Sequence, residues 1–560
     1  METMMSGARF IAETLNGYGV THVFLVMAIL RKTLVELEEL NIKRILTHSE
    51  KAAAYMADGY ARVSRKPGIC MAQSVGAANL CAGLQDPFLA HSPVIAITGR
   101  KKPIAQYRNA YQEIIHGPMY DAVTKYNVNV DAIEQLPFIL SQAFREATTG
   151  APRPVHLDLL GFAGEVIETA EINCAPVIEE QFARYPAYRF SPENEYFNKA
   201  VMHLEEAKRP VIIAGGGAIA SSAESEILQL AEALSIPVAT SNDGKGVIPD
   251  NHSLSIGVVG SYSCGVSNEL VSKADLVIFI GCSAGDQVTN DWTLPRSQTN
   301  IIQIDINPSE LGRNFRNKLC LLGDAKTSLQ GLLKLIKDID KKNDWAKHAL
   351  SEVKDWTKSI ECLCRSQAVP IRPERLCSDI SNMLPTNAVL VADTGYSAVW
   401  ASNFVFFSHP NQRFVRAAGS LGWAFPASLG VKCAAPDRPV ICFTGDGAFW
   451  YHLSELETAK RYGIKTITVI NNNSRLAQSV IGVDAAYGAR SGKRGELYKF
   501  NTIDFAKVAT DMGCMGYRIE SPDMLAETLR EALKADIPVV VDVKTDGSAR
   551  PPIPWSPPAK

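Results

Sequence analysis

The chain has 560 residues, 46% of them hydrophobic, which is too long for one core and suggests about three domains. Its 57 lysines and arginines nearly balance its 59 aspartates and glutamates, and no dense basic run marks a nucleic-acid partner. No apolar run reaches the roughly 18 residues of a membrane helix, and the N-terminus lacks a secretory pattern. We therefore expect a soluble, cytoplasmic protein with neither a nucleic-acid nor a membrane partner.

The secondary-structure pattern alternates helices with short strands throughout the chain. An amphipathic helix is predicted within residues 1–20, and strands rich in Val and Ile are predicted at 93–99, 210–218, 274–282, 301–308, 388–395, 439–447 and 464–473. This alternation predicts doubly wound α/β domains with parallel sheets, whose ligands lie at the carboxyl ends of strands. Linker-like stretches at 172–195 and 338–372 divide the chain into blocks 1–171, 196–337 and 373–560.

The first and third blocks contain a similar pattern of residues, which we call the internal echo. "AAYMADGYARVSRKPGICMAQS" around Gly59 and "AFPASLGVKCAAPDRPVICFTG" around Gly430 each predict a helix of small residues, a basic turn with proline and a strand ending in Ile-Cys. A chance resemblance is the alternative. If the echo is real, two related sheets would form a ligand site between them.

The segment "FTGDGAFWYHLSELETAKRYGIKTITVINNN" carries the strongest local signal. A strand ends in Gly445-Asp446-Gly447, and the following helix start offers N–H groups to phosphate oxygens. Mg²⁺ prefers oxygen ligands, and a strand-helix-strand unit returns the chain to the same sheet edge, so Asp446 and Asn473 are predicted to face one ion. A lone GDG is otherwise a solvent turn.

This segment resembles the diphosphate motif of thiamine diphosphate (ThDP) enzymes, and the whole chain resembles the acetolactate synthase and pyruvate oxidase superfamily. Three further stretches carry the likeness: "THSEKAAAYMADGYAR", "DTGYSAVW" and "AAGSLGWAFPASLG". The resemblance implies pyrimidine-binding, central and diphosphate-binding domains in that order. It also implies a homodimer or homotetramer with each site between two chains.

The resemblance also implies roles for individual residues. Glu50 would activate the cofactor from an apolar cavity with a raised pKa, Leu421 would wedge between the cofactor rings, and Gln112 in "YQEI" would lie near the substrate. Cofactor contacts are implied at Gly395, Tyr396, Ser397, Gly419, Leu421, Gly445, Gly447, Ala448 and Asn473, and metal ligands at Asp446, Asn473 and the carbonyl of Arg475. Ordinary roles, such as an exposed glutamate or a core leucine, are the alternatives.

Several segments depart from the acetolactate synthase pattern. A glycine-rich substrate loop is replaced by "FLVMAILRK" at 24–32, and Ser283 stands where relatives carry an arginine. A pair of adjacent histidines typical of decarboxylases is missing, and His116 nearby is read as structural or functional. "AGGGAIA" at 214–220 and "IDINPSELGRN" at 304–314 resemble a flavin framework, which leaves FAD as an open alternative.

From these features we expect an enzyme that uses ThDP and Mg²⁺ to cleave or form a C–C bond beside a carbonyl, through acyl transfer from a 2-oxo acid. Small 2-oxo acids or ketones are the expected substrates. A ThDP-dependent C–C hydrolase of the cyclic-diketone type or a non-oxidative 2-oxo acid decarboxylase is the alternative. A cofactor-binding relic without activity is disfavoured because Glu50, Asp446 and Asn473 are all present.

Overall fold

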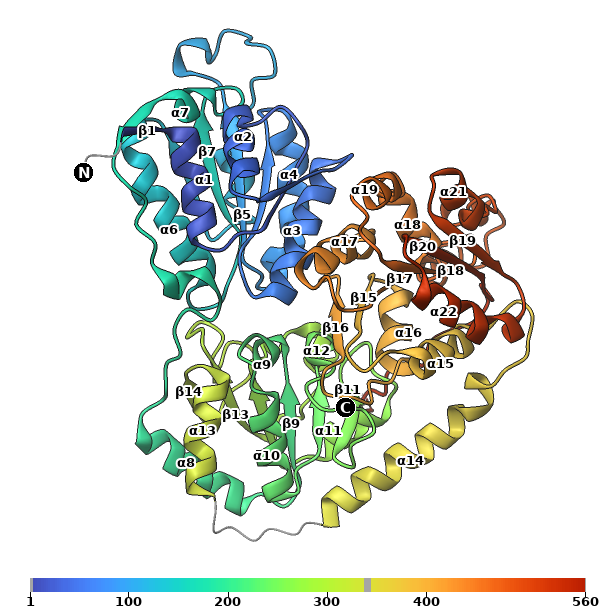
Figure 1. Cartoon of the computed structure of the whole chain (residues 1–560). Coiled ribbons are helices and arrows are strands. Elements are labelled where there is room, and N and C mark those ends of the chain that lie inside the picture. The colour runs from blue at the N-terminus through green and yellow to red at the C-terminus, as the bar shows by residue number, and fades with distance from the viewer. Residues whose placement is uncertain (1–3, 337–343, 559–560) are drawn as a thin grey trace.

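The computed structural model describes residues 4–336 and 344–558. Within them lie three six-stranded sheets in which every pair of neighbouring strands is parallel. Figure 1 shows the three sheets in separate domains, blue, green and orange to red along the chain. The predicted α/β class with parallel sheets is confirmed. The predicted block boundary at 337 and 338 lies outside the described residues.

The first domain has the strand order β3-β2-β4-β5-β7-β6. Its strands are β2 His22–Leu25, β3 Lys43–Leu46, β4 Gly68–Ala72, β5 Val94–Arg100, β6 Tyr126–Val130 and β7 Val155–Leu160. Its main helices are α1 Gly7–Gly17, α2 Arg31–Glu39, α3 Glu50–Ser64, α4 Gly76–Leu89 and α6 Leu136–Thr148. A small antiparallel pair joins β1 Met4–Ser6 to β8 Glu171–Asn173.

The central domain has the order β11-β10-β9-β12-β13-β14. Its strands are β9 Pro210–Ala214, β10 Val238–Thr240, β11 Ser255–Val258, β12 Leu276–Ile280, β13 Asn300–Asp305 and β14 Leu319–Leu322. Its helices include α8 Asn194–Glu206, α9 Gly216–Ala220, α10 Glu224–Leu234, α11 Val266–Lys273, α12 Asp286–Thr289 and α13 Ala325–Leu335. The long helix α14 Asp344–Cys364 then leads to the third domain (Figure 1).

The third domain has the order β16-β15-β17-β18-β20-β19. Its strands are β15 Val389–Ala392, β16 Arg413–Arg416, β17 Val440–Gly445, β18 Ile467–Asn472, β19 Met515–Ile519 and β20 Val539–Lys544. Its helices include α15 Pro373–Met383, α16 Tyr396–Phe404, α17 Ala424–Ala434, α18 Asp446–Phe449, α19 Glu455–Arg461, α20 Ser479–Tyr487, α21 Phe505–Asp511 and α22 Leu525–Lys534. The helix expected after the GDG turn starts within that turn, at Asp446, and is interrupted by a 3-10 turn at Trp450–His452.

The internal echo is a structural repeat. In chain order the strands of the first and third domains follow the same spatial sequence, with α3 before β4 in one and α17 before β17 in the other. These two helices pack against each other (Figure 1). A Cβ added at Gly59 would lie 2.1 Å from the Ala427 carbonyl oxygen, and one added at Gly430 would lie 1.9 Å from the Met56 carbonyl oxygen. The register runs in opposite directions along the two helices, so they cross antiparallel.

In the described part of the chain, no helix has both the length and the apolar character needed to cross a membrane.

Candidate cofactor and metal site

Asp446 and Asn473 lie together at the carboxyl edge of the third sheet. The Asn473 backbone N–H donates to Asp446 Oδ1 over 3.3 Å. Within the described residues, Asp446 Oδ2 and Asn473 Oδ1 are both buried without a hydrogen-bond partner. Burial raises the pKa of Asp446 to about 7. Because unpaired buried oxygens are costly, the pair fits a divalent cation that prefers oxygen ligands.

The third predicted metal ligand is the carbonyl of Arg475, two residues beyond Asn473. The Arg475 side chain points back along the same loop, with Nη1 donating to the Gly547 carbonyl over 3.4 Å and Nε donating to the Asn473 carbonyl over 3.4 Å. These contacts leave the guanidinium bound to the protein's own backbone. The role of the Arg475 backbone carbonyl as a metal ligand remains a prediction.

The predicted diphosphate contacts gather beside this pair, because β15 and β17 are neighbours in the sheet. Gly395 has a φ of 67° and directly precedes α16, which begins at Tyr396. A Cβ added at Gly445 would lie 3.4 Å from Ser397 Oγ, so the two strand ends meet. Gly445, Gly447 and Ala448 form the start of α18. Backbone N–H groups at such strand-to-helix turns suit phosphate oxygens.

The loop between β16 and α17 carries Gly419 and Leu421. Buried Asp393, at the end of β15, accepts the N–H groups of Gly422 and Ala424 over 3.0 and 2.9 Å. Gly419 is exposed, Leu421 is half-buried, and a Cβ added at Gly419 would have nothing within 4 Å. Gly419 therefore borders open space, on a loop that is fixed by Asp393 just beyond Leu421.

Glu50 begins α3 in the first domain, where the N-terminal end of the helix favours a carboxylate. Asn79 Nδ2 donates to Glu50 Oε2 over 3.2 Å, and a Cβ added at Gly76 would lie 2.5 Å from Glu50 Oε1. Glu50 is only half-buried. The apolar cavity predicted around it is therefore not closed within one chain.

Gln112 lies in the loop that follows β5, close to the same end of the first sheet. Its carbonyl accepts from Ser74 Oγ over 2.6 Å, its φ is 58°, and its side-chain oxygen is buried without a partner among the described residues. His116 is buried between Asp158 Oδ2 at 3.0 Å and the Ser74 carbonyl at 2.9 Å. Both of its ring nitrogens are occupied, which supports the structural reading of this histidine.

One chain does not bring the two halves of the predicted site together. Glu50 is at the start of α3, whereas Arg62, near its other end, contacts Asp86, which accepts the Gly419 N–H. Twelve residues of helix separate Glu50 from Arg62, or about 18 Å along the axis. Glu50 and Gly419 therefore lie at opposite ends of the same helix.

A cavity of about 530 Å³ lies where the carboxyl ends of the central sheet meet the other two domains, with Pro152 of the first domain and Ala418 of the third in its lining. Its lining includes the glycine triplet at 215–217 and Ser283. Five carboxylates also line it, those of Asp243, Asp286, Asp305, Glu310 and Asp324. Arg416, the one arginine or lysine among the described lining residues, is paired with Asp243. Two more of these carboxylates are also in ion pairs, Glu310 with Arg313 and Asp324 with Arg189. FAD therefore remains the alternative that the sequence raised.

Three family models match the chain in order. They describe the N-terminal TPP binding domain of thiamine pyrophosphate enzymes at residues 5–120, the central domain at 197–332 and the C-terminal TPP binding domain at 393–543. Thiamine pyrophosphate is the same compound as ThDP. The chain belongs to the thiamine pyrophosphate enzyme family. Its expected membership is thereby confirmed, and so is the ThDP-binding character of its outer domains.

Relatives of this family member align along nearly the whole chain. A probable acetolactate synthase large subunit of Methanocaldococcus jannaschii is 33% identical, covering 97% of this chain and 92% of the relative. The acetolactate synthase large subunit of Haemophilus influenzae is 29% identical, covering 97% and 95%. The acetolactate synthase isozyme 3 large subunit of Escherichia coli is 28% identical, covering 97% and 96%.

Two carboxylates of this thiamine pyrophosphate enzyme were not singled out from the sequence. Asp393 and Asp86 both bind backbone N–H groups of the loop at 417–424. Asp393 could have been suspected, because it ends an apolar strand just before Gly395. Asp86 lies inside a helix next to Pro87, and only the packing of two domains gives it a partner.

Proposed function

We propose that this protein uses ThDP and Mg²⁺ to form or cleave a C–C bond beside a carbonyl, by acyl transfer from a 2-oxo acid, as in acetolactate synthesis. The observation that carries the proposal is the pair of orphaned oxygens on Asp446 and Asn473, next to the N–H groups of two strand-to-helix turns. A cation would bind the two oxygens, and a diphosphate would accept hydrogen bonds from the N–H groups of the two turns. The acetolactate synthases among its relatives support the reaction class.

The residues of the third domain would hold the cofactor. Asp446, Asn473 and the Arg475 carbonyl would bind the metal, while the turns at 395–397 and 445–448 would bind the diphosphate. When bound, ThDP supplies a carbon acid whose conjugate base attacks carbonyl carbons. Leu421 would set the angle between its rings from the apex of the loop, and the Gly419 carbonyl would accept from its amino group.

The residues of the first domain would activate the cofactor and meet the substrate. Glu50, oriented by Asn79, would hold a proton against the pyrimidine ring. Gln112, with its buried and unpaired side-chain oxygen, would lie near the substrate.

We further propose that two chains build each site, in a homodimer or a larger homo-oligomer. The distance between Glu50 and Gly419 within one chain supports this arrangement. Large apolar side chains on the loop after β5 also support it, since Ile104, Tyr107, Tyr111 and Ile115 are each between 61% and 86% exposed. Several exposed large apolar side chains on one loop support a partner surface there. Figure 1 shows it as the light-blue loop that stands away from the first domain.

The substrate end of the site differs from the acetolactate synthase pattern, so the reaction partner is a separate question. Ala28, in the replaced loop at 24–32, has a φ of 130°, a conformation that favours glycine. Ser283 offers a hydroxyl at the central cavity where a cationic fork would otherwise stand. A C–C hydrolase or decarboxylase on the same ThDP chemistry is the alternative that this loop keeps open.

Product analysis tests the proposal. Purified protein with ThDP, Mg²⁺ and pyruvate is incubated with and without an acceptor aldehyde, and products are followed by mass. Acetolactate or a mixed hydroxyketone supports acyl transfer. Acetaldehyde alone supports the decarboxylase. Turnover of cyclic diketones to open-chain acids, without turnover of pyruvate or larger 2-oxo acids, would overturn the proposal in favour of the hydrolase.

A further inference from the structure

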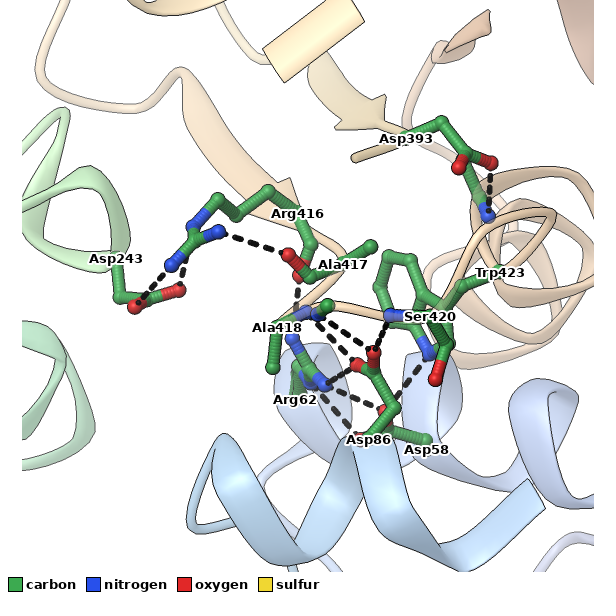
Figure 2. Close-up of polar contacts among 12 residues, drawn as sticks. Asp58, Arg62, Asp86, Asp243, Asp393, Arg416, Ala417, Ala418, Ser420 and Trp423 are labelled. Atoms are coloured by element: carbon green, nitrogen blue, oxygen red, sulfur yellow. Dashed lines mark hydrogen bonds and ion pairs between the residues drawn. The ribbon is translucent and has the colours of Figure 1, made fainter. Parts of the chain in front are cut away.

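The loop at 417–424 is held by carboxylates from two different domains. Asp86, on α4 of the first domain, accepts the N–H groups of Ala418, Gly419 and Ser420 over 3.0, 3.1 and 3.0 Å. Asp393 holds the following segment by the N–H groups at 422 and 424. Figure 2 shows Asp86 pointing from α4 into the loop backbone. The apex of the loop, at 421, lies between the two anchored segments.

Asp86 is an unusual place for a carboxylate. It is fully buried and lies in the last turn of α4, where the helix dipole disfavours negative charge. Arg62 Nη2 donates to Asp86 Oδ1 over 2.8 Å and also to Asp58, so one cation is shared by two buried acids. The charge of Asp86 is therefore balanced in large part by the three N–H groups of the loop.

The same cluster ties the loop to the rest of its own chain. Arg62 Nη1 donates to the Arg416 carbonyl over 2.6 Å, and the Trp423 indole donates to Asp58 Oδ2 over 2.9 Å. The Arg416 guanidinium binds Asp243 of the central domain (Figure 2). All three domains thus converge on the backbone that presents Gly419 and Leu421.

We propose that Asp86 is a positioning residue for the cofactor: it sets the backbone of 418–420 and, through it, the direction of the Gly419 carbonyl and the Leu421 side chain. This inference rests on the proposed function. In a dimer, the first domains of the two chains would then have different tasks at each site. The chain's own first domain fixes the loop from behind through Asp86, and the partner's first domain would supply the proton-handling glutamate.

The decisive variant is Asp86→Asn. An amide keeps the size of the side chain, but its NH₂ group replaces an acceptor oxygen and faces N–H donors or Arg62. We expect the variant to fold and bind ThDP with Mg²⁺. Exchange of the C2 proton of bound ThDP with deuterium, measured by NMR after acid quench at saturating ThDP, is expected to slow on the order of 10²-fold, as misplacement of about 1 Å does.

Asp379→Asn is the matched control, because Asp379 is a buried acid of the third domain that pairs with Arg375 over 2.7 Å, away from the loop. A purely structural anchor would make Asp86→Asn resemble this control, with lower stability and a wild-type exchange rate. That result would overturn the proposal. Pyruvate takes no part in the measurement, so a failure of the proposed acyl transfer leaves the exchange result decisive.

A second measurement needs only the wild-type protein and covers the case in which Asp86→Asn does not fold. In deuterium exchange resolved to single residues by mass spectrometry, the amides of 418, 419 and 420 are expected to be protected without ThDP. Rapid exchange at these three amides would refute the anchoring. Wild-type protein that takes up no ThDP would overturn both this inference and the proposed function.

Discussion

At the scale of single residues, the site combines side chains that the protein leaves unsatisfied with others that it satisfies fully. Asp446 Oδ2 and Asn473 Oδ1 are buried without partners in the described structure, whereas both nitrogens of His116 are bonded. Buried polar groups are normally paired, so these two neighbouring orphaned oxygens support the proposed cation site. The saturated histidine marks structure instead.

Asp446→Asn is expected to weaken Mg²⁺ binding in the presence of ThDP by at least ~10-fold, because a charged ligand becomes neutral. Titration of Mg²⁺ against thermal stability, with ThDP present, measures the change. Asp437→Asn, at an exposed position before β17, is the control and should behave as wild type. Equal Mg²⁺ dependence in both variants would remove Asp446 from the metal site.

Glu50→Gln is expected to retain ThDP binding while activity falls by roughly 10² to 10⁴-fold, since proton transfer by a positioned acid or base contributes that much. Calorimetry with ThDP and Mg²⁺ measures binding, and product formation from the active substrate measures activity. Glu361→Gln, in an exposed ion pair with Arg365, is the control. Unchanged activity in Glu50→Gln would refute the activation mechanism.

At the scale of elements, the helix pair α3 and α17 sets the relation between the first and third domains. Close approach is allowed because Gly59 and Gly430 present no side chain at the crossing, where each faces a carbonyl of the other helix. Glycine in a helix interior weakens the helix by itself, so its presence in both indicates a packing requirement. This crossing also places Glu50 and Gly419 at opposite ends.

Gly59→Ala is expected to destabilise the protein by about 1 to 3 kcal/mol, because the added Cβ would lie 2.1 Å from the Ala427 carbonyl oxygen and the helices must separate. Gly482→Ala, in α20 with nothing within 4 Å of the added Cβ, is the control and should stabilise by about 0.5 to 1 kcal/mol. Urea unfolding measures both. A stabilising Gly59→Ala would contradict the close crossing.

At the scale of the whole molecule, the first and third domains are two copies of one architecture, and we propose that a second chain completes the site between them. The repeat gives each chain one pyrimidine half and one diphosphate half. Because α3 and α17 cross antiparallel, these halves face away from each other within the chain. A twofold partner would supply the missing half to each.

Mixing Glu50→Gln with Asp446→Asn tests this arrangement. Each variant by itself is expected to lose most of its activity when Mg²⁺ is held below the range that Asp446→Asn needs. A mixed dimer would pair the intact first domain of one chain with the intact third domain of the other. For random association of equal amounts, about one quarter of all sites would be active, since half of the dimers are mixed and each has one intact site. Activity assayed after co-refolding is the measurement. No recovery, despite mixed dimers seen by mass spectrometry, would place the site within one chain.

The sequence by itself determined the fold class and indicated the repeat, whereas most of the candidate site residues came from the family resemblance and stay predictions. Strand runs rich in Val and Ile showed the parallel sheets, and the GDG turn followed by "NNN" brought Asp446 and Asn473 together, because strand-helix-strand units return to one sheet edge. These inferences depend on local periodicity and short-range connection. They do not depend on how domains pack.

Only the tertiary structure decided what joins the domains. Asp86 has no local signal, because its three N–H donors come from residues more than 330 positions away. The cavity beside the glycine triplet likewise gathers residues of all three domains, among them His91, Ser283 and Arg416. Such contacts arise from the free energy of packing between domains, which no window of sequence contains.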